Sequence, residues 1–369
     1  MKTNVLFSVL FAAGVLFASC SKDDDPTPLT KEEAVVEIAS LKTTYDSEDK
    51  AMNNNEGMKV FNQLSTTTLP FVMPDADQSI RSKINSFHPR MDVAKKGNVR
   101  AMQQSLVVRS EFVFSQYVGT WEWNKQTQVW DHTSTPTDKV VVKFAYPSTS
   151  ATNNAAYTIT KYTLASGLDG VSGDYNANIT VDGNIVWTIA LSGSYTSSTS
   201  FITATSNQTI TYTSIAVPKV SYEFKESAEL KMSGNETAGN ISMKASSSIK
   251  KNGETLLSAD VNVTAKSTST SGEVKATANL RIANVRFEFV TSYTGSATGG
   301  QSDIIANASM TVYSASGAKI GYMKNEVDAY GAEVLMFYYN NGDKDLASNV
   351  FGKLFKEFFY IFDGLDSVF

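Results

Sequence analysis

The chain has 369 residues, of which 42% are hydrophobic and 19% charged, and its formal net charge is −5. A mild acidic excess offers no basic surface for a nucleic-acid partner, and a single cysteine excludes an internal disulfide. The length suits one large domain or two ordinary ones.

The chain begins with the three parts of a secretory signal peptide, residues 1–19. Lys2 provides the positive start, residues 5–17 form an apolar run, and Ala18 and Ser19 form a small-residue cleavage site. The apolar run is too short to span a membrane as a helix. We therefore expect an exported protein whose mature chain starts near Cys20.

The segment Leu16-Phe17-Ala18-Ser19-Cys20 resembles a bacterial lipoprotein lipobox, with Phe17 where that motif usually has leucine. The resemblance implies that Cys20 is acylated; the alternative is an ordinary signal peptide with a chance cysteine. The acidic run of residues 21–25 resembles the export signal of surface lipoproteins of the Bacteroidota, which implies an outer-membrane lipid anchor facing the cell surface or, alternatively, the periplasm. Residues 20–28 would form an extended linker.

Residues 29–110 are expected to be mainly helical. Thr30 and Glu33 have the spacing of a capping box, after which Ile38, Leu41 and Tyr45 recur at helical intervals. Residues 53–57 interrupt this helix before a short second one, and a third is expected between about 75 and 89.

Residues 111–342 alternate between apolar and polar side chains, as in the strands of an antiparallel sheet with one dry face. The clearest stretch is 220–232, where the even-numbered residues are mostly apolar and the odd-numbered ones polar. Turn dipeptides such as Asn252-Gly253 separate the strands, and we expect on the order of twelve of them.

The last segment, 343–369, is expected to form an apolar helix from Asp345 to Phe362, capped by Asp343 or Asp345. Its apolar surface is so wide that more than one side should be buried. The residues expected to pack on the sheet or to line a ligand site beside it are Val350, Phe351, Leu354, Phe355 and Phe358.

These elements predict an α+β fold, with residues 29–369 forming one domain: a large curved antiparallel sheet, an N-terminal helical layer and a buried apolar C-terminal helix. The architecture resembles the half-barrel lipid and lipoprotein carriers of the LolA type. That resemblance implies a hydrophobic ligand held between sheet and helices.

A tryptophan-rich hairpin offers a second candidate binding site. A turn over residues 124–127 would pair Trp123 with Gln128 and Trp121 with Trp130, so that three of the four tryptophans share one face. Such a face binds sugar rings or apolar ligands when it is exposed, and seals a core when it is buried.

Motifs of catalysis and metal binding are lacking. The two histidines, His88 and His132, have no metal-ligand spacing, and Glu122 and Asp131 are interpreted as surface acids on neighbouring strands. We expect no cofactor and no enzyme activity. The sequence favours a lipid-anchored binding protein for a hydrophobic or amphipathic ligand; the alternative is a surface module that binds a glycan or protein partner through Trp121, Trp123 and Trp130.

Overall fold

The computed structural model describes residues 26–71, 113–167, 170–198, 200–234, 238–268, 271–296, 309–327, 331 and 333–352. Cys20, the predicted third helix with His88, and Leu354, Phe355 and Phe358 therefore lie outside the described residues. Four helices fall within these ranges: α2 (Lys31–Asn53), α3 (Glu56–Thr66), α7 (Phe114–Tyr117) and α9 (Ala347–Phe351).

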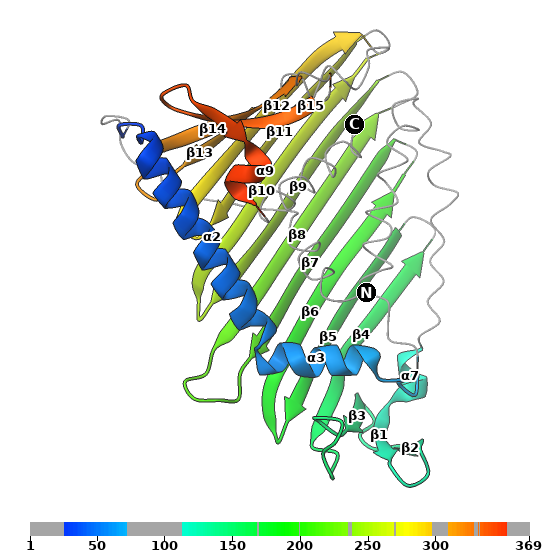
Figure 1. The fold of residues 1–369 in the computed structure, drawn as a ribbon. Coiled ribbons are helices and arrows are strands. Elements are labelled where there is room, and N and C mark those ends of the chain that lie inside the picture. Colours follow the sequence, from blue (N-terminus) through cyan, green and yellow to red (C-terminus); the bar gives the residue numbers. More distant parts are fainter. Residues whose placement is uncertain are drawn as a thin grey trace.

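The predicted large sheet is confirmed, and it is open rather than closed (Figure 1). In the described ranges its strands run in the spatial order β16 to β3 by descending number, followed by β1 and β2. Their bounds are β1 Gly119–Asn124, β2 Val129–Thr133, β3 Val140–Phe144, β4 Ala155–Gly167, β5 Gly170–Val181, β6 Asn184–Ser197, β7 Phe201–Thr213, β8 Ser221–Gly234, β9 Gly239–Lys251, β10 Glu254–Ser267, β11 Ser271–Ile282, β12 Val285–Ser296, β13 Ser309–Tyr313, β14 Lys319–Val327, β15 Glu333–Tyr339 and β16 Lys344–Leu346.

Two expectations about the sheet need correction. The described part of the chain holds sixteen strands instead of about twelve. All neighbouring strands are antiparallel except β1 and β3, which are parallel because β1 inserts between β3 and the edge strand β2. The chain between β2 and β3 therefore passes the start of β1 at one end of the strands, an arrangement that short connections alone do not indicate.

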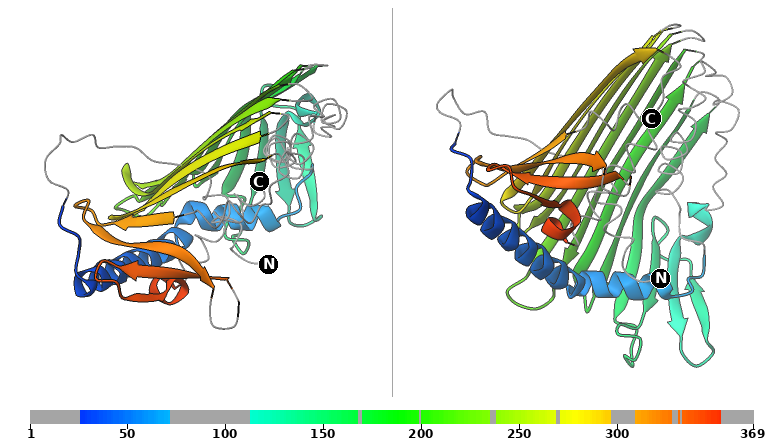
Figure 2. Two further views of the ribbon diagram at one scale, coloured as in Figure 1. Left: turned by 90° about the horizontal axis from the view of Figure 1, so that it is seen from above. Right: turned by 45° about the horizontal axis from the view of Figure 1, so that its top comes forward.

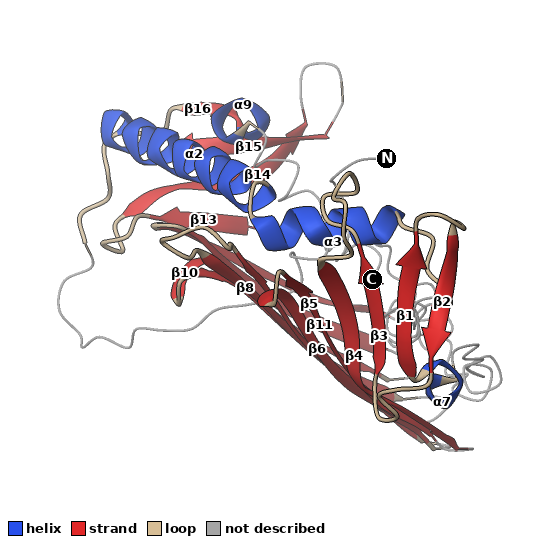
Figure 3. Cartoon of the chain, turned by 90° about the horizontal axis from the view of Figure 1, so that it is seen from below, coloured by secondary structure: helices blue, strands red, loops and turns tan. Residues whose placement is uncertain are grey.

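The sheet curves, so that β1–β3 at one edge and β13–β16 at the other turn toward the side occupied by α2 and α3 (Figure 3). These two helices follow one another along the same end of the long strands (Figure 2). Helix α2 packs over β12 and β14, and α3 packs over β5, β6 and β7. The helices thus cover the concave side at that end of the sheet.

The predicted capping box starts α2. The Thr30 amide donates to Glu33 Oε2 at 2.9 Å, and the Glu33 amide donates to Thr30 Oγ1 at 3.3 Å. The predicted interruption is also confirmed: α2 ends at Asn53, and Asn55 caps α3 by accepting from the Gly57 amide at 2.9 Å. Sequence alone thus located both helix ends.

Burial follows the predicted alternation of β8. Tyr222, Phe224, Leu230 and Met232 are buried, whereas ion pairs Glu223–Lys225 and Glu229–Lys231 lie on the opposite face. The residues of β7 and β9 that pair with these positions lie on the same face as their partners in β8. The dry face therefore points toward the helices, and the convex face is polar.

The C-terminal helix begins later than predicted. Residues 344–346 form strand β16, in which Asp345 pairs with Phe337, and α9 starts at Ala347. Neither Asp343 nor Asp345 caps it, because Leu346 occupies the N-cap position and provides no side-chain bond. Edge pairing with β15 has overridden the helical pattern at this point.

Candidate functional site

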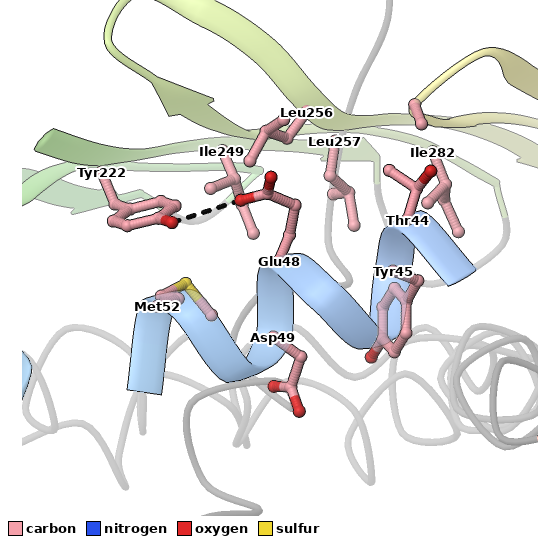
Figure 4. Close-up of a pocket in the computed structure, with 11 residues that line it drawn as sticks. Thr44, Tyr45, Glu48, Asp49, Met52, Tyr222, Ile249, Leu256, Leu257 and Ile282 are labelled. Carbon is pink, nitrogen blue, oxygen red and sulfur yellow. Dashed lines mark hydrogen bonds between the residues drawn. The ribbon is translucent and has the colours of Figure 1, made fainter. Parts of the chain in front are cut away.

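An apolar cleft lies between the second half of α2 and the ends of β9, β10 and β11 (Figure 4). It has a volume of about 40 Å³, and its exposed lining is almost entirely apolar. Pockets for drug-sized ligands enclose about 300 to 1,000 Å³, so this cleft admits the end of a chain and not a whole lipid. The lining residues are Thr44, Tyr45, Glu48, Asp49, Met52, Tyr222, Ile249, Leu256, Leu257, Ile282 and Ala283.

Two sets of side chains determine the position of the cleft. One set lies on one side of α2 at helical spacing, and the other consists of cross-strand neighbours on the sheet that face it. Glu48 and Met52 are four residues apart and share one side of α2, while Asp49 points away from the sheet (Figure 4). On the sheet, Leu257 pairs with Ile249 and with Ile282, so three aliphatic side chains stand side by side. They form an apolar surface beneath the helix.

A cluster of three polar side chains closes one end of this cleft. Lys251 Nζ donates to Glu48 Oε1 at 2.7 Å and to Oε2 at 2.9 Å, and the Tyr222 hydroxyl donates to Glu48 Oε2 at 3.2 Å. Burial, followed by the nearby Glu48 carboxylate, raises the pKa of Tyr222 to about 12. Tyr222 therefore stays protonated at neutral pH and remains a hydrogen-bond donor.

A row of polar side chains interrupts the dry face farther along the strands. Gln208 on β7, Glu226 on β8 and Ser247 on β9 are direct cross-strand neighbours. Gln208 and Ser247 are buried, and all three have interactions with other groups of the protein. Buried polar groups require such partners, so the row forms polar contacts on the otherwise apolar face.

Sequence reasoning missed this row, although a signal was present. Glu226 occupies a position whose parity is otherwise apolar in β8, between Phe224 and Ala228. An acidic residue on the dry side of an alternating strand indicates a polar contact there. The partners of a strand residue depend on register, which the local pattern does not fix.

Two of the predicted C-terminal site residues fall within the described chain. Phe351 is completely buried, and its ring lies edge-on to Phe287 at 5.7 Å and to Phe337 at 5.3 Å. Val350 is half-buried, and its carbonyl accepts from Lys42 Nζ at 3.3 Å. At Phe351 the chain thus forms part of the core.

The tryptophan hairpin forms with a register two residues away from the predicted one. Trp123 pairs with Trp130 and Trp121 with His132, so the three predicted tryptophans still share one face. The rings of Trp123 and Trp130 meet edge to face at 5.2 Å, and Trp121 stacks on His132 at 4.1 Å. The Trp121 indole donates to the Tyr117 carbonyl at 3.0 Å, and the Trp130 indole to the Thr68 carbonyl at 3.1 Å.

The acids of this hairpin do not form a catalytic cleft. Glu122 and Asp131 are exposed cross-strand neighbours, as predicted, and His132 lies on the opposite face. Glu122 pairs with Lys143 at 3.5 Å, and Asp131 accepts from Asn124 at 2.9 Å. In the part of the chain that the structure covers, no group of histidine, cysteine and acidic side chains could hold a metal ion.

None of the helices in the described ranges combines the length and hydrophobicity that a bilayer-spanning segment needs. Comparison with known proteins gives no family: no family model, no curated protein and no solved structure matches the chain.

Proposed function

We propose that the chain is a lipid-anchored lipoprotein of the outer membrane, displayed on the cell surface, that binds the apolar end of a hydrophobic or amphipathic ligand. The anchor would be acyl chains on Cys20, and residues 20–28 would tether the folded domain to the membrane. The protein would act as a binding module without a cofactor rather than as an enzyme.

One observation carries the ligand-binding part of this proposal: the apolar cleft between α2 and the sheet. Its floor is aliphatic, so an alkyl end gains free energy by leaving water, at about 25 cal/mol per Å² of buried apolar surface. The Glu48, Lys251 and Tyr222 cluster at one end gives the polar part of an amphipathic molecule a place to stay hydrated or to hydrogen-bond.

The cleft that supports this proposal lies under the N-terminal helix α2. The sequence favours a ligand between the sheet and the C-terminal helix, and that position stays a prediction. Phe351 contributes to packing rather than to an open surface. Leu354, Phe355 and Phe358 lie outside the described residues, so a contribution from them remains part of the proposal.

The proposal is tested by filling the cleft. Leu256, a half-buried lining residue, is replaced by tryptophan, and binding of the fluorescent probe N-phenyl-1-naphthylamine is titrated against the full chain. We expect at least tenfold weaker binding, because the indole occupies the aliphatic floor. The matched control is Val290→Trp, which adds the same side chain at an exposed position of β12 outside the cleft. Equal affinities of both variants and the unmodified chain would contradict the proposal.

A further inference from the structure

The hairpin of β1 and β2 holds three half-buried tryptophans, Trp121, Trp123 and Trp130, at the rim of the sheet. Strand β2 is the edge strand among the described residues, at the opposite edge from β16, and the hairpin stands near α7 (Figure 1). Trp121 and Trp130 pack against the main core, whereas Trp123 belongs to neither buried apolar cluster. Trp123 is thus the ring of this face that core packing explains least.

The neighbouring contacts fix these rings in place. Hydrogen bonds to backbone carbonyls hold the indoles of Trp121 and Trp130, and Trp130 in turn meets Trp123 at 62°. A ring that is held by its neighbours loses little side-chain freedom when a ligand stacks on it. The geometry therefore provides a pre-organised aromatic surface.

Charge and polarity around the rings narrow the class of ligand. The two acids of the hairpin, Glu122 and Asp131, lie on its other face and are paired with Lys143 and Asn124, while Lys125 lies in the turn. Along β1 and β2 the aromatic face therefore carries no acidic side chain and no lysine or arginine, and the His132 ring lies beside the tryptophans. A neutral aromatic surface beside the exposed imidazole of His132 suits a ligand with apolar C–H faces and hydroxyl groups.

The tip of the hairpin argues against insertion into a membrane. Residues 125–128, which form the turn, are polar and exposed, and Lys125 donates to the Ser150 carbonyl. A loop that enters the interface presents apolar or aromatic residues at its tip. Here the tryptophans lie on the side of the ribbon instead.

We propose that the Trp123 and Trp130 face is a second binding site, independent of the cleft under α2, and that its ligand is a pyranose glycan. A sugar ring stacks its C–H face on the Trp123 indole, and its hydroxyl groups reach the Nδ1 edge of His132, whose Nε2 already bonds to the Val118 carbonyl at 3.1 Å. This site lies at the edge of the sheet, and glycan binding there should not alter ligand binding in the cleft.

The test applies the full chain, its Trp123→Ala variant and a control variant to an array of several hundred plant, bacterial and animal glycans, followed by titration of the best-bound oligosaccharide. The control is Tyr338→Ala, which removes one ring of the stacked Tyr322–Tyr338 pair on β14 and β15, far from the hairpin in the strand order. Circular dichroism verifies that both variants fold.

We expect binding to at least one pyranose glycan, with affinity at least tenfold lower in Trp123→Ala and unchanged in Tyr338→Ala. Binding to no glycan on the array would overturn the proposal, as would glycan binding that survives Trp123→Ala. Adsorption to phosphatidylglycerol vesicles that depends on Trp123, in the absence of glycan binding, would overturn it in favour of a membrane contact. The Trp123→Ala variant should still bind N-phenyl-1-naphthylamine in the cleft under α2. This measurement distinguishes a failure of the glycan site from a failure of the cleft.

Discussion

Lys251, the last residue of β9, donates two hydrogen bonds to Glu48 of α2, although 203 residues separate them in the chain. The pair fastens the second half of the helix to the sheet directly beside the apolar cleft. The Tyr222 hydroxyl adds a third bond to the same carboxylate. The position of α2 over the dry face thus depends on polar contacts as well as on apolar burial.

Replacing Lys251 by methionine should lower the free energy of unfolding by about 1 kcal/mol, because the partly buried Glu48 carboxylate loses its cation. Urea unfolding measures the change. The matched control is Lys344→Met, which breaks the more exposed Lys344–Glu326 pair at 2.7 Å and should cost less. An equal loss in both variants would mean that the Lys251 pair adds nothing beyond an ordinary surface contact.

Replacing Phe351 by alanine should cost about 3 to 5 kcal/mol, because the ring is fully buried between Phe287 and Phe337 and leaves a cavity. Val350→Ala, at the adjacent half-buried position, should cost about 1 kcal/mol. Urea unfolding of both variants provides the comparison. If Phe351→Ala were as mild as Val350→Ala, α9 would not be part of the core.

Removing the side-chain cap of α2 by Thr30→Ala should cost about 1 kcal/mol, because the Glu33 amide loses its acceptor and the capping box opens. Thr43→Ala removes a hydroxyl that bonds only to the Ala39 carbonyl inside the same helix, and it should be close to neutral. Thermal unfolding followed by circular dichroism distinguishes the two. The reverse order of effects would be inconsistent with the cap.

Asp260 on β10 should make stability depend on pH. Burial raises its pKa from 3.8 to about 6, and the residues directly opposite, Ser246 and Asn279, carry no charge. Because the folded state holds this proton more tightly than the unfolded chain, the stabilisation is complete below pH 4 and is lost as pH rises through 6.

The Asp260→Asn variant should therefore be more stable than the unmodified chain at pH 7, by about 1 kcal/mol once solvent screening is allowed for. At pH 4 the difference should nearly vanish, since the aspartic acid is then also neutral in the folded state. Urea unfolding at the two pH values measures it. A pH-independent difference would assign the effect to something other than the carboxyl group.

Sequence predicted best where a local period determines which face is buried. The alternation around Tyr222 and Phe224 placed the dry face correctly, because a strand has only two faces. The capping box located a helix start from two residues, Thr30 and Glu33. Both inferences need only neighbours in the chain.

Sequence failed where the answer depends on backbone conformation or on distant partners. The loop of the tryptophan hairpin ends at Gln128, which has a φ of 56°, and Asn124 accepts from the amides of Gln126 and Thr127. Glutamine gives no signal for a positive φ, so the predicted turn was placed one residue too early and the register shifted by two. The cleft also could not be foreseen, because α2 meets β9 through residues about two hundred positions apart.

The most direct measurement of ligand binding in the cleft is photo-crosslinking of the full chain with a photoreactive palmitic acid, followed by peptide mass spectrometry. We predict labels on the cleft-facing side of residues 44–52 and on residues 249–257, and their loss in Leu256→Trp but not in Val290→Trp. Labels spread evenly over the surface, or labels that persist in Leu256→Trp, would contradict the binding of an apolar ligand in the cleft.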